Sequence, residues 1–205
     1  MRRQLSSTLL RGALYAAALI AITTTLPASL AAQQVPAGKA PTSSLEVAVT
    51  WNGTLSNAIT SSRFWMEGGS VDVHGQFYRG LGVVADIAGA HTANINASSV
   101  GLDMVTATFG PRYTWSRAHQ RYQFFAQGLV GIANGFNSVF PSSNGANTVP
   151  SGLAVKAGGG VNVALTPHIA LRAAEVNWLR TQFPNSTTNV QNNITFGAGV
   201  VVRFR

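Results

Sequence analysis

The sequence of 205 residues contains no cysteine, and only 10% of its residues are charged. Without cysteine the chain has no disulfide framework, which suits a protein that is exported without one. The scarcity of charge leaves few side chains that could cover the surface of a water-soluble domain. Beyond the N-terminus no apolar run reaches the roughly eighteen residues of a transmembrane helix, so such a helix is excluded there.

The first 31 residues have the features of a secretory signal peptide. Three arginines give a basic start, residues 13–22 form an apolar core, and residues 29–31, Ser-Leu-Ala, resemble a cleavage site. We expect residues 1–31 to be removed and residues 32–43 to form a flexible periplasmic linker. Removal lowers the basic residues from 14 to 11 against 6 acidic ones, so the net charge falls from +8 to +5. No cluster of basic residues remains, so we expect no nucleic-acid partner.

The clearest pattern that is present is an alternation near the end of the chain. From Ile194 to Phe204 the even positions are apolar, whereas the odd positions are mostly polar or glycine. This period of two, held for about ten residues, has the length of a β-strand that crosses a bilayer at a tilt. Seven further segments share the pattern, and the eight predicted strands are Leu45–Asn52, Trp65–Phe77, Leu81–Ala90, Met104–Trp115, Tyr122–Ala133, Gly152–Leu165, Ile169–Leu179 and Asn192–Arg205.

One predicted strand, Ile169–Leu179, contains a change of phase. Arg172 lies on the inward parity, but Glu175 and Asn177 lie on the opposite one. One extra residue at Ala173–Ala174 would bring all three polar side chains to the same face, so we predict a β-bulge there.

The connections between the predicted strands are alternately long and short. This pattern of connections is typical of an outer-membrane barrel with short periplasmic turns, longer external loops and both termini in the periplasm. Closure of the barrel removes the strand edges that lipid could not hydrogen-bond. Aromatic residues at both ends of the strands fit two interfacial girdles; they are Trp51, Trp65 and Trp178 at the external ends and Tyr78, Tyr113, Trp115 and Tyr122 at the periplasmic ends.

We therefore predict an all-β fold, an eight-stranded antiparallel up-and-down transmembrane barrel over residues 44–205. The alternative is a soluble β-barrel or sandwich in which the same alternation would point the apolar residues inward. That alternative would need a charged surface, which a chain with 10% charged residues can hardly supply.

Three short motifs also carry a resemblance to a known family. They are Phe109-Gly-Pro-Arg-Tyr113, His168-Ile-Ala-Leu-Arg172 and the terminal Gly199-Val-Val-Val-Arg-Phe204. With them, residues Leu45–Phe204 resemble the small eight-stranded outer-membrane barrels of Gram-negative bacteria, namely the OmpA-type transmembrane domain and its stand-alone relatives. The resemblance implies a porin-like barrel that resides in the cell envelope among outer-membrane lipids.

The same resemblance implies that the end of the chain is an assembly signal for the barrel-assembly machinery. Gly199, Val202 and Phe204 are the residues of this signal. The chain departs from the family pattern at Arg205, where a final aromatic residue is usual, and at Gly197, where a polar residue is typical.

Charged residues on the inward parity are balanced in sign. An eight-stranded barrel is just wide enough for side chains to fill it, and buried charges need partners. We predict a plugged polar lumen that contains a lumen charge network of four acids and four bases: Glu46, Asp72, Asp86, Arg112, Lys156, Arg172, Glu175 and Arg203.

Two of these acids are expected to face each other. Counting back from the tight turn at Tyr78–Gly80 places Asp72 directly across from Asp86, with both side chains inward. Facing carboxylates repel each other at low dielectric, so a base must lie between them. We predict that Arg112 bridges the pair, because a guanidinium fork can bind two carboxylates.

No catalytic chemistry is predicted. Ser70, Asp72 and His74 share one face of a strand, but alternate residues lie about 7 Å apart, too far for a hydrogen bond between nucleophile and base. The remaining histidines are not grouped as metal ligands would be. We therefore predict no catalytic residue, no metal and no cofactor.

These features predict a monomeric structural protein of the outer membrane that serves envelope integrity and presents surface loops, without an open pore. The alternative is an adhesin or ligand-binding barrel that acts through its external loops, with Phe136 and Phe140 of the loop Asn134–Ser151 exposed as the contact. A lipid-modifying barrel enzyme is the third hypothesis, and a small-solute channel is the fourth.

Overall fold

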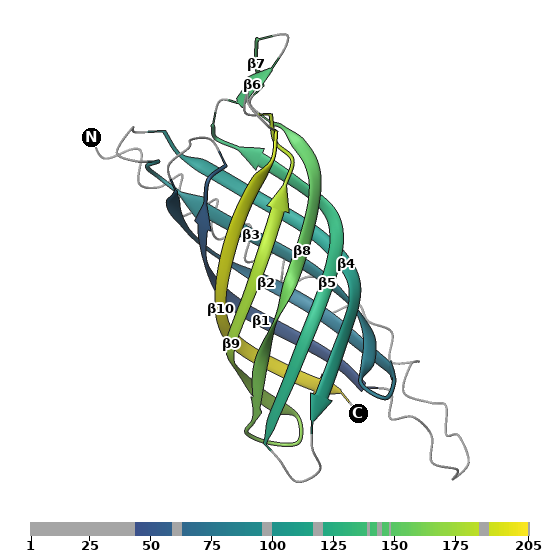
Figure 1. Ribbon diagram of the computed structural model, residues 1–205. Helices are drawn as coiled ribbons and strands as arrows, with labels where there is room; N and C mark the ends of the chain where they lie inside the picture. The colour runs from purple at the N-terminus through teal and green to yellow at the C-terminus, as the bar shows by residue number, and fades with distance from the viewer. Residues whose placement is uncertain are drawn as a thin grey trace. The chain divides into compact units, whose positions relative to one another are not determined.

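The computed structural model describes residues 44–58, 63–95, 100–116, 121–138, 140–142, 145–147, 149–184 and 189–204. The predicted signal peptide and linker, and Arg205, lie outside these ranges. Within them, eight strands close into one antiparallel barrel in the order β1-β10-β9-β8-β5-β4-β3-β2 (Figure 1). No described residue belongs to a helix that is long and apolar enough to cross a membrane.

All eight predicted strands are confirmed, each paired with its neighbours along the chain. A short β6–β7 hairpin is inserted between β5 and β8 and is not part of the ring. The bounds are β1 Ser44–Ser56, β2 Phe64–Tyr78, β3 Leu81–Thr92, β4 Leu102–Ser116, β5 Tyr122–Phe136, β6 Phe140–Ser142, β7 Gly145–Asn147, β8 Ser151–Ala164, β9 Ile169–Thr181 and β10 Gln191–Phe204.

The two ends of the barrel differ in their connections (Figure 1). We call the end with the short β2–β3, β4–β5 and β8–β9 connections, together with Ser44 and Phe204, the turn end. The opposite end, which carries the longer connections and the β6–β7 hairpin, is the loop end. Several strands run further toward the loop end than predicted; β1, for example, continues from Asn52 to Ser56 because its ladders with β2 and β10 continue there.

The tight turn between β2 and β3 consists of Arg79 and Gly80. Their φ angles are 38° and 92°, the left-handed values that the mirror-image hairpin turns require. A Cβ atom on Gly80 would also lie 2.1 Å from the carbonyl oxygen of Thr114, so the turn needs a glycine. The amide of Thr114 donates to the Gly80 carbonyl at 2.7 Å and thereby ties this turn to β4.

The predicted bulge in β9 is confirmed. Gly197 pairs with Glu175 and Gly199 pairs with Arg172, so Ala173 and Ala174 together face a single residue of β10. The bulge returns Glu175 to the interior, where it is 5% exposed. A second bulge, in β2 at the turn end, was not predicted: Tyr78 rather than Phe77 pairs with Leu81.

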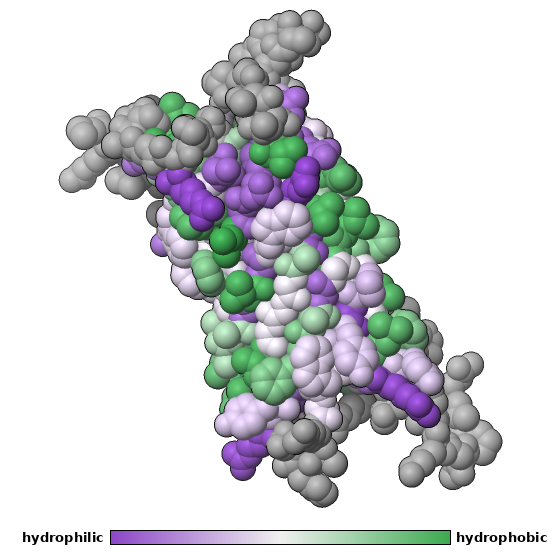
Figure 2. All heavy atoms as spheres, in the orientation of Figure 1, coloured by the Kyte–Doolittle hydropathy of each residue, from purple (hydrophilic) through white to green (hydrophobic). Residues whose placement is uncertain are grey.

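The outer face of the barrel is apolar and its interior is polar. Large hydrophobic side chains such as Phe109 (61% exposed) and Ile87 (54%) point outward, whereas arginines and carboxylates are buried inside. Figure 2 shows apolar and weakly polar residues over the middle of the visible face and hydrophilic ones toward its ends. The soluble alternative, which would reverse this arrangement, is excluded.

Aromatic residues lie on the outer face toward both ends. At the turn end Trp115 stacks on Tyr113 and on Phe124, with ring centroids 5.8 Å and 6.3 Å apart. Near the loop end Trp65 covers Gly53, where an added Cβ would lie 2.1 Å from the indole. Trp51 is further from the loop end than predicted, because β1 continues for five residues beyond it.

Candidate functional site

The eight residues of the lumen charge network all lie inside the barrel. Their exposed fractions are between 1% and 7%, and each takes part in at least one ion pair. They come from seven of the eight strands of the ring, namely β1, β2, β3, β4, β8, β9 and β10. The network is therefore assembled only when the ring is closed.

Its centre is the carboxylate of Asp72, which lies between two arginines. Arg112 Nη1 donates to Asp72 Oδ1 at 2.8 Å, and Arg172 Nη1 contacts Asp72 Oδ2. The same Arg172 nitrogen donates to Glu175 Oε2 at 2.8 Å. Arg172 thus links two acids, one from β2 and one from its own strand beyond the bulge.

Phe125 lies under both of these arginines. The guanidinium carbons of Arg112 and Arg172 are 4.6 Å and 4.9 Å from its ring centroid, within the range of cation–π interaction. A Cβ on Gly160 would come within 2.8 Å of the ring, so this glycine leaves room for Phe125. Sequence reasoning did not select Phe125, although it shares the inward parity of Gln123 and Gln127.

Two amide side chains complete the central cluster. Gln127 Oε1 accepts from Arg112 Nε at 2.9 Å and from Nη2 at 2.6 Å. Its Nε2 donates to Glu175 Oε1 at 3.1 Å and to Asn177 Oδ1 at 3.0 Å, and Asn177 Nδ2 donates to Glu175 at 2.8 Å. Both amide groups therefore have their hydrogen-bond partners inside the barrel.

The predicted register of the two facing acids is confirmed, but the predicted bridge between them is wrong. Asp72 pairs with Asp86 across β2 and β3. Asp86 is neutralised by Lys156 Nζ from β8, and of the two facing acids Arg112 contacts Asp72 alone. The reason is the register of β4: Thr108 faces Asp86, and Arg112 lies four residues further toward the turn end.

A third group of charges lies nearer the turn end. Glu46 Oε1 accepts from Arg203 Nε at 2.9 Å, and Glu46 Oε2 lies 3.3 Å from His74 Nδ1. Arg203 Nη2 contacts Gln123, which also accepts from Asn162 Nδ2 at 3.3 Å. Asn162 accepts from Arg172 Nε at 3.3 Å and so connects this group to the central cluster.

The three polar residues in line on β2 do not form a catalytic group. Ser70 Oγ accepts from Asn52, Asp72 binds two arginines, and His74 binds Glu46. Among the described residues no group of histidine, aspartate and glutamate side chains could hold a metal ion.

The loop end of the lumen is filled differently, by an apolar plug of buried side chains. Phe140 was predicted to be an exposed contact, and this is wrong: it is 0% exposed and packs on Phe183 with ring centroids 5.5 Å apart. Phe136 is half-buried in β5, paired with Asp103, rather than in a loop. The largest side chains of the plug are Phe64, Met66, Leu102, Met104, Phe140 and Phe183.

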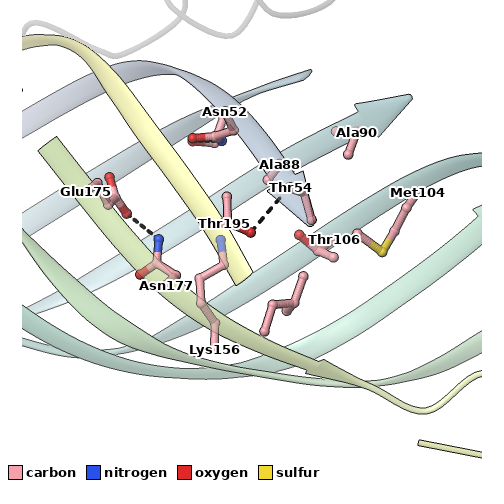
Figure 3. A pocket seen from close by; sticks show the side chains of 13 residues that line it. Asn52, Thr54, Ala88, Ala90, Met104, Thr106, Lys156, Glu175, Asn177 and Thr195 are labelled. Carbon is pink, nitrogen blue, oxygen red and sulfur yellow. Dashed lines mark hydrogen bonds between the residues drawn. The ribbon is translucent and has the colours of Figure 1, made fainter. Parts of the chain in front are cut away.

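A small cavity lies between the charged and the apolar parts of the lumen (Figure 3). Lys156 and Glu175 line one side of it and Met104 another, and Thr54 and Thr195 share a hydrogen bond of 3.2 Å in its wall. Its volume is about 20 Å³. A space of this size holds about one water molecule.

The residues of the predicted assembly signal lie on β10. Val202 and Phe204 point outward, 39% and 52% exposed. Gly199 faces inward against β1, where a Cβ would lie 2.1 Å from the carbonyl oxygen of Val49. This close approach explains the glycine, and the role of the three residues in assembly stays a prediction.

A closed ring of eight antiparallel strands with an apolar outer face and a charged interior is the fold of the small outer-membrane β-barrels. Among the solved structures that share it is Neisserial surface protein A, with a TM-score of 0.63 and 12% identity; the match covers 78% of this chain and 97% of that one. Another is Ail, the attachment invasion locus protein of Yersinia pestis, with a TM-score of 0.55 and 15% identity; the match covers 79% of this chain and 99% of that one. No protein-family model and no curated protein sequence matches the chain. At these identities the likeness concerns the fold, and it confirms the fold expected from the resemblance to the OmpA-type barrels.

Proposed function

We propose that the chain is a structural protein of the bacterial outer membrane, with its turn end in the periplasm and no open pore. The observation that carries the proposal is the filled interior, in which each of the four buried acids has a basic partner. Such a lumen serves as a core, because the cavity found among its described residues has room for about one water molecule.

The proposal includes export through the signal peptide at residues 1–31 and insertion as a monomer by the barrel-assembly machinery. It does not include enzymatic activity, because Ser70 and His74, the polar pair nearest to a nucleophile and a base, each have another partner. An acyl-hydrolase assay on the purified barrel tests this point, and turnover would contradict it.

Gel mobility combined with membrane fractionation tests the placement in the membrane. A closed barrel stays compact in detergent until it is heated, so boiled and unboiled samples from the outer-membrane fraction should migrate differently. Identical mobility of protein recovered from a soluble fraction would refute the proposal.

Planar-bilayer recording tests the absence of a pore. The folded protein should show little steady current, because buried charged and apolar side chains project into the lumen. Uniform conductance steps that vanish on heat denaturation would favour the channel hypothesis instead.

A ligand-binding barrel is the second candidate, because Ail has this fold and one of its structures contains the heparin analogue sucrose octasulfate, with a TM-score of 0.53 to this chain. The β6–β7 hairpin extends beyond the ring at the loop end (Figure 1). However, the charged side chains described at the loop end balance in sign: they are Arg63 and Arg180 against Glu67 and Asp103. A ligand of the loop end would therefore be uncharged rather than polyanionic.

A loop variant separates the two candidates. Replacing residues 142–147 by a short Gly-Ser link keeps Phe140 and hence the apolar plug. If the loop end binds cells or glycans, this variant loses binding while its heat-dependent mobility is unchanged. If the barrel is structural, wild type and variant show the same low background in cell-attachment assays.

A further inference from the structure

The two ends of the barrel differ in their exposed charge. All six acidic residues of the chain fall within the described ranges. Four are buried in the lumen charge network, and the other two, Glu67 and Asp103, lie at the loop end. The exposed charged side chains described at the turn end are Arg79 and Arg121, so no carboxylate side chain neutralises this end from outside.

The two arginines lie next to exposed aromatic side chains on neighbouring hairpins. Arg79 follows Tyr78 in the β2–β3 turn, with its guanidinium carbon 5.4 Å from the centre of the tyrosine ring. Arg121 directly precedes Tyr122 at the start of β5. Both tyrosines are 55% exposed, and the β2–β3 turn is hydrogen-bonded to β4, the partner of β5.

This order along the barrel axis matches the layers of a lipid leaflet. Apolar residues face the acyl chains, tyrosine and tryptophan lie at the interface, and arginines just beyond them reach the headgroups. A guanidinium group binds phosphate oxygens through a fork of donors. The position of both arginines at the outer rim, next to exposed tyrosines, favours lipid over an acidic protein as their partner.

We propose that the rim of the turn end, with Arg79 and Arg121 beside Tyr78, Trp115 and Tyr122, binds the phosphate headgroups of anionic glycerophospholipids in the surrounding leaflet. The inference rests on the proposed membrane location. Near a membrane surface one arginine contributes about 1 kcal/mol of attraction to anionic lipid, which corresponds to about a fivefold preference over zwitterionic lipid.

The tryptophans allow this end to be probed separately. Of the four in the chain, Trp115 alone lies at the turn end. A protein with Trp51→Phe, Trp65→Phe and Trp178→Phe therefore reports on that end by its fluorescence. It is inserted into mixed phosphatidylcholine and phosphatidylglycerol vesicles in which one or the other lipid carries brominated acyl chains, and the two degrees of quenching are compared.

We expect brominated phosphatidylglycerol to quench Trp115 as if enriched about fivefold, and the enrichment to fall at high salt. Arg79→Gln with Arg121→Gln should abolish the enrichment, whereas the matched pair Arg63→Gln with Arg180→Gln at the loop end should preserve it. Equal quenching by both lipids in the parent, or enrichment that survives loss of Arg79 and Arg121, would overturn the proposal. Absence of quenching by either lipid would instead refute the membrane location itself.

Discussion

Buried charged side chains line the lumen from the turn end to its middle, whereas the buried apolar side chains of the plug gather at the loop end. The first region contains six ion pairs, and three of them join strands that are not neighbours in the ring, such as Asp86 of β3 with Lys156 of β8. The second contains Phe140 and Phe183, which come from the connections after β5 and β9 and pack back into the mouth of the barrel. The cavity near Thr54 and Thr195 marks the boundary.

The two regions should respond differently to substitution. A buried ion pair is directional and requires both partners, since removing one leaves a charge without compensation. An apolar contact depends mainly on volume, so a side chain of similar size can replace another. The charged region therefore determines which strands meet across the lumen. The apolar plug, which closes the mouth, tolerates substitution by other apolar side chains better.

The largest effect is expected for Arg172→Leu. The change removes the basic partner of Glu175 and one of the two partners of Asp72. We expect the free energy of unfolding to fall by about 4–5 kcal/mol, the upper part of the range for breaking a buried pair. Urea unfolding in lipid vesicles, followed by tryptophan fluorescence, measures the loss.

The matched control for this variant is Arg172→Leu combined with Glu175→Leu. Removing both members of a pair avoids the uncompensated charge, so the double variant should recover a large part of the stability. A double variant that is as unstable as the single one would show that Arg172 acts through packing on Phe125 rather than through charge.

A smaller effect is expected in the plug. Phe140→Ala should lower the free energy of unfolding by about 3 kcal/mol, because it empties a buried aromatic site. Phe140→Leu should lower it by only about 1 kcal/mol, because an apolar side chain of similar volume is kept. Equal losses for the two variants would contradict the volume-dependent behaviour that distinguishes this region from the charged one.

The sequence was sufficient to predict what depends on local spacing. Alternation placed the strands and their faces, the changed parity between Arg172 and Glu175 predicted the bulge, and the tight turn determined that Asp72 faces Asp86. Each of these features is decided within one hairpin or one strand, where a period of two leaves few choices.

Contacts across the lumen could not be predicted in the same way. Lys156 reaches Asp86 from a strand that is not adjacent to β3, so the contact depends on the stagger of the whole ring. Phe140 lies in a segment rich in serine and asparagine, and nothing in its spacing shows that it turns inward. Phe125 shares its parity with two inward glutamines, but an aromatic residue on a membrane strand is expected to face lipid.

Arg112→Lys tests the geometry of the charged region while keeping the charge. A lysine can bind Asp72 as a point charge, but it cannot also donate two hydrogen bonds to Gln127 and stack on Phe125. We expect a loss of about 2 kcal/mol in the free energy of unfolding. Arg79→Lys, on the exposed turn, is the control and should change stability little; a similarly small loss for Arg112→Lys would mean that charge alone holds the cluster.

The smallest effect is expected at the boundary, where Thr54 and Thr195 share a hydrogen bond beside the cavity. Thr195→Val should cost about 1 kcal/mol, because it leaves the buried hydroxyl of Thr54 without this partner. Replacing both threonines by valine should be nearly neutral, since no polar group is then left unpaired. A loss for Thr195→Val that is also close to zero would show that water in the cavity takes over the bond, as its volume permits. A double variant less stable than the single one would instead show that this boundary requires polar partners, as the charged region does.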